Sequence, residues 1–419
     1  MTTPSSTRDL IRVFGRIGLL SFGGPAAQIA LMHRELVEAR SWLSERQFLN
    51  ALSFCMLLPG PEAMQLATYA GWRLRGVAGG LLAGGLFVLP GAAIILILAM
   101  LYARFGQLPL VEAVFLGIKS AVIIIVIQAL FKLAQRALTS RLAYFIAAAG
   151  FLGLFVFQLP FPLLILGAGL IGAVFMAGEA QSQSPPLVPI TSTLRICLIF
   201  GALWLGPLAA LWLLAPDGFL TEVGVFFSKL AVVSFGGAYA VLAYMVQAVV
   251  ADFGWLSTGQ MMDALGLAET TPGPLILVTE FVGFVAGQSH GGTGFGVAAA
   301  LVTLWATFMP CFLWIFAGAP YVDWISQQPR LTGALKAIAA SVVGVIANLS
   351  VWFALHVWFS QIGRIGGEQI GLWWPVGGSL SGSAVALSLV AAVLLVWRKL
   401  DLLVVLGIMA ACGACLSLI

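Results

Sequence analysis

Two short motifs interrupt apolar stretches of the sequence, and each of them occurs twice. One is Ser-Phe-Gly-Gly, at 21–24 and 234–237, and the other is Pro-Gly-Pro, at 59–61 and 272–274. Proline inside a helix removes a backbone donor and clashes with the preceding turn, so each motif is costly within a helix. Freed backbone groups are tolerated in lipid only where protein buries them or where they line a polar cavity. We therefore predict discontinuous or re-entrant helices at SFGG and PGP.

The chemistry that such breaks favour is anion binding. A helix that restarts after a break presents unpaired N–H groups and the positive end of its dipole, and neighbouring hydroxyls add donors. The competing interpretation is close packing and kinking, which suits Gly76/Gly80/Gly84 and Gly283/Gly287 better. The candidate substrate-binding residues at the breaks are Ser21, Phe22, Gly23, Gly24, Pro59, Gly60, Pro61, Ser234, Phe235, Gly236, Gly237, Thr270, Thr271, Pro272, Gly273 and Pro274.

Charged residues within apolar segments form the second set of candidates, because burying a charge in a membrane is costly. Lys119 and Lys336 are the predicted counter-charges for a bound dianion. The candidates for coupling or gating are Arg16, Lys229, Glu62 and Glu280. The alternative is that the cations anchor helix ends at the interface and that the acids form structural ion pairs. The aspartates, Asp263 among them, are expected at segment ends or in loops.

The elements that position these residues must be membrane helices. Hydrophobic residues make up 61% of the 419 residues and charged residues 9%, against roughly 25% charged in a soluble domain. Apolar runs of about 20 residues, enough to cross a bilayer, recur from end to end. We predict an all-α integral membrane protein with about thirteen segments, at 14–32, 48–72, 76–103, 109–131, 142–157, 161–178, 195–214, 223–245, 260–286, 294–319, 331–358, 379–397 and 400–419.

Several function classes are disfavoured by what the sequence lacks. There is no Gly-x-x-x-x-Gly-Lys-[Ser/Thr] phosphate loop, and the three histidines are scattered without metal-ligand spacing. The net charge of +4 lies largely in loops, where it is a topological signal rather than a nucleic-acid patch. We predict no enzymatic activity, no cofactor, no metal and no nucleic-acid partner, with the lipid bilayer as the surrounding medium.

The chain contains an internal repeat. A shift of 213 residues lays the first SFGG and PGP on the second, and a shift of 220 later lays Pro90 on Pro310. Each half holds six segments, and the extra segment at 195–214 reverses the second half, so we predict inverted repeats. The predicted organisation is a cytoplasmic tail at 1–10, a first repeat at 11–180, a linker with a connecting helix at 181–221, and a second, inverted repeat at 222–419.

Lysine and arginine placement predicts the topology, because cytoplasmic loops are enriched in both. The basic clusters put the N-terminus in the cytoplasm and the C-terminus in the periplasm. The loop at 33–46 leaves two alternatives. Either 14–32 and 48–72 each cross the membrane, or both are re-entrant hairpins that turn at Gly23-Gly24 and at 59–61 and keep the loop inside. We favour hairpins, because the matching loop at 246–258 has no lysine or arginine.

The motifs resemble the chromate ion transporter family in its long, two-domain form. The stretches that carry the resemblance are FGRIGLLSFGGPAAQIALMHRELV, LLPGPEAMQLATYAG, FFSKLAVVSFGGAYAVLAYM, TTPGPLILVTEFVGFVAG and VVGVIANLS. The resemblance implies a secondary transporter in the bacterial inner membrane that exports chromate and confers chromate resistance, with sulfate as the similar oxyanion. A sulfate or other oxyanion carrier, a receptor or channel, and a homodimeric assembly remain open at this stage.

Overall fold

The chain folds as a helical protein with two compact units. A computed structural model describes residues 6–178, 189–235, 237–325, 328–366 and 371–417. Unit 1 comprises 1–103, 179–241 and 271–328, and unit 2 comprises 104–178, 242–270 and 329–419. Five helical stretches of the described residues are long and apolar enough to cross a membrane: Glu62–Phe105, Pro109–Ala137, Ile190–Leu214, Leu275–Tyr321 and Pro329–Trp358. The prediction of a helical membrane protein is therefore confirmed.

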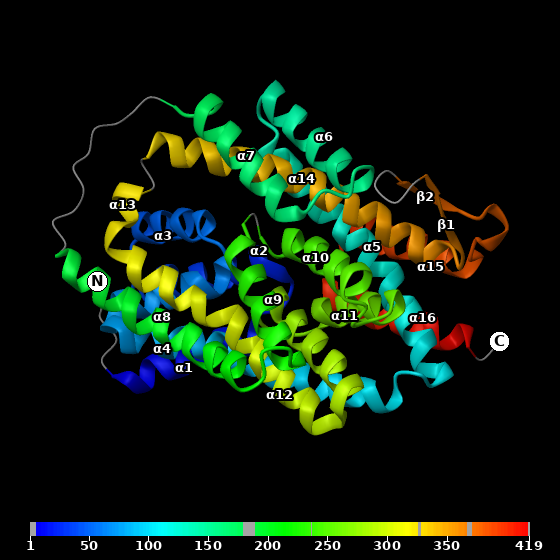
Figure 1. Cartoon of the computed structure of the whole chain (residues 1–419), viewed down its shortest axis with the longest axis horizontal. Coiled ribbons are helices and arrows are strands. Elements are labelled where there is room, and N and C mark those ends of the chain that lie inside the picture. Colours follow the sequence, from blue (N-terminus) through cyan, green and yellow to red (C-terminus); the bar gives the residue numbers. More distant parts are fainter. Residues whose placement is uncertain (1–5, 179–188, 236, 326–327, 367–370, 418–419) are drawn as a thin grey trace. The chain divides into compact units, whose positions relative to one another are not determined.

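Unit 1 holds the four predicted breaks. Its elements are α1 Thr7–Leu20, α2 Gly24–His33, η1 Arg34–Glu38, α3 Glu45–Leu57, α4 Glu62–Phe105, α8 Ile190–Leu214, α9 Phe219–Val233, the start of α10 Ala238–Val246, η3 Leu275–Leu277, α12 Val278–Gly318, η4 Ala319–Tyr321 and α13 Val322–Ile325 (Figure 1). Capping boxes begin two of them, Ser6 with Asp9 at α1 and Ser44 with Gln47 at α3. Both pairs satisfy N–H groups that a helix start leaves unpaired.

The helix α4 is a hairpin of two arms, 62–74 and 77–105, because Arg75 and Gly76 are not helical. Gly71 on the first arm packs against Gly79 on the second, and Gly84 packs against Thr68. The glycines at 80 and 84 are thus packing residues, as predicted. The prediction was wrong for Gly76, which makes the turn itself with φ +63° and open space around its Cα.

The helix α12 repeats this design in the second half. Its arms, 278–290 and 293–318, meet at a break at Gly291 and Gly292. Gly283 packs against Thr303 and Gly287 packs against Ala299, which confirms the predicted packing role of both glycines.

The second arms of α4 and α12 run antiparallel to each other within unit 1. Gly80 of α4 lies against the ring of Phe316 of α12, and Gly84 lies against the ring of Phe312. The residue number of the contact rises along α4 while it falls along α12, so the two arms have opposite directions. A two-fold axis that exchanges two antiparallel spanning helices lies in the membrane plane, which is the relation between inverted repeats.

The segment between α1 and α4 folds back on itself. Arg75 Nη1 donates to Thr7 Oγ1 at 3.1 Å, so α1 begins at the turn of α4. Arg16 of α1 forms an ion pair with Glu35 of η1 at 3.5 Å. A straight continuation would separate these two residues by roughly 28 Å at 1.5 Å per residue. The chain therefore reverses at Gly23-Gly24, as the hairpin alternative requires.

A second contact places the end of α3 beside α12. The ring of Phe54, on α3, packs against Gly318 at the end of α12. That end of α12 lies at the turn of α4, since Gly80 contacts Phe316. Phe54, near the end of α3, therefore lies close to the turn of α4. Whether 48–72 crosses the membrane or re-enters stays a prediction, as does the side of the loop at 33–46.

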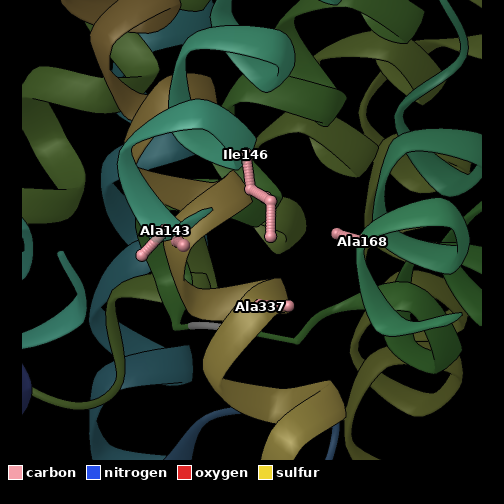
Figure 2. Close-up of a cluster of buried hydrophobic side chains, with 5 residues drawn as sticks. Ala143, Ile146, Ala168 and Ala337 are labelled. Atoms are coloured by element: carbon pink, nitrogen blue, oxygen red, sulfur yellow. The ribbon is translucent and has the colours of Figure 1, made fainter. Parts of the chain in front are cut away.

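Unit 2 is built around two long helices, α5 Pro109–Ala137 and α14 Pro329–Trp358. The helix α14 packs on α6 Arg141–Phe155 and α7 Phe161–Phe175, and α5 packs on α15 Gly382–Ala392 and α16 Leu402–Leu416. Figure 1 shows α14 beside α6 and α7. Small residues allow this packing, as in the cluster of Ala143, Ile146, Ala168, Ala337 and Ala340 (Figure 2).

The remaining elements of unit 2 are short. They are the end of α10, η2 Gln247–Asp252, α11 Thr258–Thr270, η5 Gly377–Ser379, η6 Val393–Trp397 and the strands β1 Ile362–Gly366 and β2 Gly371–Pro375. The strands pair antiparallel, with Gly363 opposite Trp374. These strands, which form the one β-sheet among the described residues, lie between two predicted segments and were not predicted from the sequence.

Each compact unit draws on both halves of the sequence. In unit 2, helix α14 of the second half packs on α6 and α7 of the first, while α5 of the first half packs on α15 and α16 of the second. This exchange is what a two-fold relation between intertwined halves produces. The boundaries of the repeats themselves, at 11–180 and 222–419, stay a prediction.

Candidate functional site

The first SFGG motif ends α1 and starts α2. The Ser21 hydroxyl is buried and donates to the Ile17 carbonyl at 2.6 Å, which caps the last turn of α1. Gly23 and Gly24 have φ of +84° and +76°, the left-handed region that a side chain disfavours. The helix α2 then begins at Gly24 with Pro25 in its first turn, where the missing N–H of proline costs nothing.

The first PGP motif links α3 to α4 and is buried throughout. Gly60 has φ +118°, and a Cβ added there would lie 2.7 Å from Gln65 Nε2 and 2.8 Å from Cys311 Sγ. Gln65 Nε2 donates to the Pro59 carbonyl at 2.7 Å and holds the loop against the start of α4. Glycine is thus required at 60 both for its backbone angle and for space.

The second copies have the same backbone character. Ser234 is buried and its hydroxyl donates to the Ala231 carbonyl at 2.7 Å. Gly237 and Gly273 both have φ +94°, whereas Gly236 lies outside the described residues. Phe22 and Phe235 are half-buried, and Thr271 and the second PGP are buried. The predicted breaks at all four motifs are confirmed.

Two hydrogen bonds join the breaks across the halves of the sequence. Gly60 N–H donates to the Ser234 carbonyl at 3.1 Å, and Gly273 N–H donates to the Ser21 carbonyl at 2.9 Å. Under the 213-residue shift each bond becomes the other, with donor and acceptor halves exchanged. An operation that places each half on the other, and returns each half to its starting place when it is applied twice, is a rotation about a two-fold axis.

A second pair of contacts obeys the same exchange and gives the depth of the breaks. Gly60 lies against Cys311, and Gly273 lies against Gly91, which is the match of Cys311 under the 220-residue shift. A Cβ at Gly91 would overlap the Pro272 carbonyl oxygen. Because Gly91 is at the middle of the 77–105 arm, the second Pro-Gly-Pro lies halfway along a helix that is long and apolar enough to span a membrane.

One residue that holds the breaks together was missed by the sequence analysis. The buried Gln28 donates from Nε2 to the Gly273 carbonyl at 2.7 Å and to the Ser21 carbonyl at 3.2 Å. One amide thus satisfies acceptors from both halves. The polar, buried character of position 28 on α2 was the available signal, but its match at Val241 is apolar, so the repeat did not point to it.

The charged candidates of unit 1 occupy different surroundings. Glu62 Oε1 lies 3.9 Å from where a Cβ at Gly237 would stand, so this acid is beside a break of the other half. Glu280 is 1% exposed, and its Oε2 has no hydrogen-bond partner among the described residues. Lys229 is exposed, and the Arg16 side chain is 60% exposed beside Glu35. Exposure of both cations favours the interfacial alternative for this pair.

The predicted lysines belong to unit 2. Lys119 Nζ lies 2.7 Å from Asp263 Oδ1 in an ion pair whose side chains are 16% and 12% exposed. The expectation that Asp263 sits at a segment end was wrong, because it lies within α11 and is buried. Lys336 is exposed on α14, and Thr270 donates to the Leu267 carbonyl at 2.8 Å as part of the last turn of α11.

Within the described part of the chain no three His, Cys, Asp or Glu side chains gather as a metal site would require. The five cysteines are free. The chemistry that unit 1 offers is therefore that of backbone N–H groups, hydroxyls and buried carboxyls around interrupted helices.

Comparisons with known proteins agree on one family. The family model described as "Chromate transporter" matches residues 8–173 and again 221–414. The chain is 31% identical to a chromate transport protein of Cupriavidus metallidurans, with 84% of each chain covered. It is 33% identical to a probable chromate transport protein of Synechococcus elongatus, covering 83% of this chain and 84% of the relative. A chromate transport protein of Pseudomonas aeruginosa is 31% identical, with 83% and 81% covered. No solved structure matches.

Proposed function

Since this chain belongs to the chromate transporter family, we propose that it is a secondary transporter that exports chromate across the bacterial inner membrane. Chromate is a tetrahedral oxyanion with two negative charges. Its export from the cytoplasm would confer chromate resistance on the cell. Sulfate, which has the same shape and charge, is the alternative substrate.

The observation that carries the proposal is the pairing of four helix breaks within unit 1, each Ser-Phe-Gly-Gly with the Pro-Gly-Pro of the other half. The helices α2, α4 and α10 and the turn η3 begin directly after these breaks. The first turn of a helix leaves N–H groups without an intrahelical acceptor and adds the positive end of the dipole. Discontinuous helices that face each other near the midplane are the form that substrate sites take in carriers with inverted repeats.

The driving force is the membrane potential, alone or together with a proton gradient. Moving one charge across 100 mV is worth about 2.3 kcal/mol, so a dianion that leaves a negative interior gains about 4.6 kcal/mol. Uptake of sulfate would have to overcome the same term by cation symport. Export by alternating access, as the two halves rock about the site, is therefore the energetically favoured direction.

Everted membrane vesicles, whose interior corresponds to the outside of the cell, test this function. With an imposed potential, positive inside, vesicles that contain the protein are expected to accumulate chromate well above vesicles from cells that lack it. Excess sulfate measures whether the site also accepts that anion. Chromate entry equal to that of protein-free vesicles, at normal membrane levels of the protein, would overturn the proposal.

Glu280 is the proposed proton carrier if a pH gradient also drives export. Burial without a partner is costly for a charged carboxylate and favours its exchange with a neutral, protonated form. Glu280→Gln fixes the neutral form, so the variant is expected to lose the stimulation of chromate flux by a pH gradient while it keeps the response to a potential.

The control for this variant is Glu112→Gln, which alters an exposed acid at the start of α5 and should keep both responses. Flux in Glu280→Gln that still follows the pH gradient, or wild-type flux that never does, would contradict a proton role for Glu280.

A further inference from the structure

The ion pair between Lys119 and Asp263 lies inside unit 2, away from any helix end of α5. Lys119 is on the third turn of α5, and its Nζ is 2.7 Å from Asp263 Oδ1 on α11. Both side chains are mostly buried, at 16% and 12% exposed. The contact joins a helix of the first half to a helix of the second, both within this unit.

Stability alone does not explain a pair of this kind. The desolvation of two buried charges roughly cancels their attraction, and apolar replacements are often as stable. Ionisable side chains within membrane helices instead tend to mark the path of a substrate or ion. The pair therefore calls for a functional reason.

The internal repeat supplies a natural comparison in which the charges are missing. Under the 220-residue shift Lys119 corresponds to Ala339, and under the 213-residue shift Asp263 corresponds to Asn50. These matching positions lie on α14 and α3, where the fold is built without either charge. The ion pair is thus not duplicated with the repeat, and its two matching positions lie in different compact units.

We infer that Asp263 is an internal counter-ion that the transported oxyanion displaces from Lys119. The inference rests on the proposed function and gives the anion a second point of contact on its path, within unit 2. Without substrate the carboxylate neutralises the ammonium group. An arriving dianion carries twice the charge of the carboxylate and offers several oxygen acceptors to the three N–H donors of lysine. Competition between the two anions then keeps the lysine from holding its substrate too tightly to release it.

Substitutions of the two residues of the pair are expected to change the half-maximal chromate concentration in opposite directions. Asp263→Asn frees Lys119, so the chromate concentration that gives half-maximal flux falls, by roughly tenfold, and the maximal rate falls because release is slower. Lys119→Ala removes the cation, so the half-maximal concentration rises by roughly tenfold or more. A purely structural pair would make both single variants worse in the same direction.

The decisive variant is Lys119→Ala/Asp263→Asn, which installs the residues that the other half carries at the matching positions. It leaves no uncompensated charge, so we expect normal membrane levels together with the low flux of Lys119→Ala. If this double variant does not reach normal membrane levels, Lys119→Gln/Asp263→Asn is used instead, because it removes both charges with smaller changes in side-chain length. Lys132→Ala, which alters an exposed lysine of the same helix, is the control.

All of these variants are compared by the chromate flux into everted vesicles, measured over a range of chromate concentrations. Wild-type flux is measured first, because its absence overturns the proposed function and the exchange with it. Given wild-type flux, a double variant that transports like wild type makes the pair structural and overturns the inference. A half-maximal concentration that rises in Asp263→Asn overturns it as well.

Discussion

Gly91→Ala is expected to reduce chromate flux strongly. A methyl group at this position would overlap the Pro272 carbonyl oxygen and stand 2.6 Å from Leu277 Cδ1. The obstacle is the backbone of a buried loop, which has no rotamer by which to move aside. Overpacking a rigid site costs about 1–3 kcal/mol, and here the displaced loop is the Pro-Gly-Pro break itself. The expected loss is roughly tenfold or more in the rate of flux.

The matched control for this variant is Gly85→Ala on the same arm of α4. A Cβ at Gly85 meets no atom within 4 Å, and alanine favours the helix by about 1 kcal/mol over glycine. Gly85→Ala is therefore expected to transport like wild type with equal or greater thermal stability. Equal flux in the two variants, at equal membrane levels, would contradict a role for the contact between Gly91 and Pro272.

Replacing both glycines of the first SFGG motif is expected to have a comparably large effect. Gly23 and Gly24 have positive φ, and Gly24 has open space around its Cα, so substitution there strains the backbone without a steric clash. For alanine the left-handed conformation costs about 1–2 kcal/mol per residue, whereas asparagine adopts it more readily. Gly23→Ala/Gly24→Ala should therefore lose most of its flux, and Gly23→Asn/Gly24→Asn should keep much more of it.

Sequence reasoning located the helix breaks because proline and glycine act locally. The angles at Gly23, Gly60, Gly237 and Gly273 follow from residue type and immediate neighbours. The reversal of the chain at Gly23-Gly24 was also accessible, since the distribution of lysine and arginine favoured a hairpin there. These features required no knowledge of which helices pack together.

The features that sequence reasoning missed depend on contacts between distant segments. Gln28 donates a hydrogen bond to a carbonyl 245 residues away along the chain. Asp263 forms an ion pair with Lys119 only because α11 packs on α5. Gly76 matched a packing pattern by spacing, yet the hairpin turn falls on it. A spacing rule identifies small residues on one face but gives no information about where a helix ends.

The repeat also contained more information than its motifs revealed. It predicted two equivalent halves, and the exchange of hydrogen bonds between Gly60 and Ser234 and between Gly273 and Ser21 shows how they meet. Each half supplies one partner of each hydrogen bond. For this reason the compact units cut across the repeats rather than following them.

The central claim is that chromate binds at the paired helix breaks of unit 1, and equilibrium binding of radioactive chromate to the purified protein tests it most directly. Wild type and Gly23→Asn/Gly24→Asn are expected to bind chromate, and Gly23→Ala/Gly24→Ala is expected to bind it at least roughly tenfold more weakly, in keeping with about 2–4 kcal/mol of backbone strain. Thermal unfolding of each sample confirms that the variants are folded. Chromate binding of equal strength by the folded alanine variant and wild type would contradict the claim.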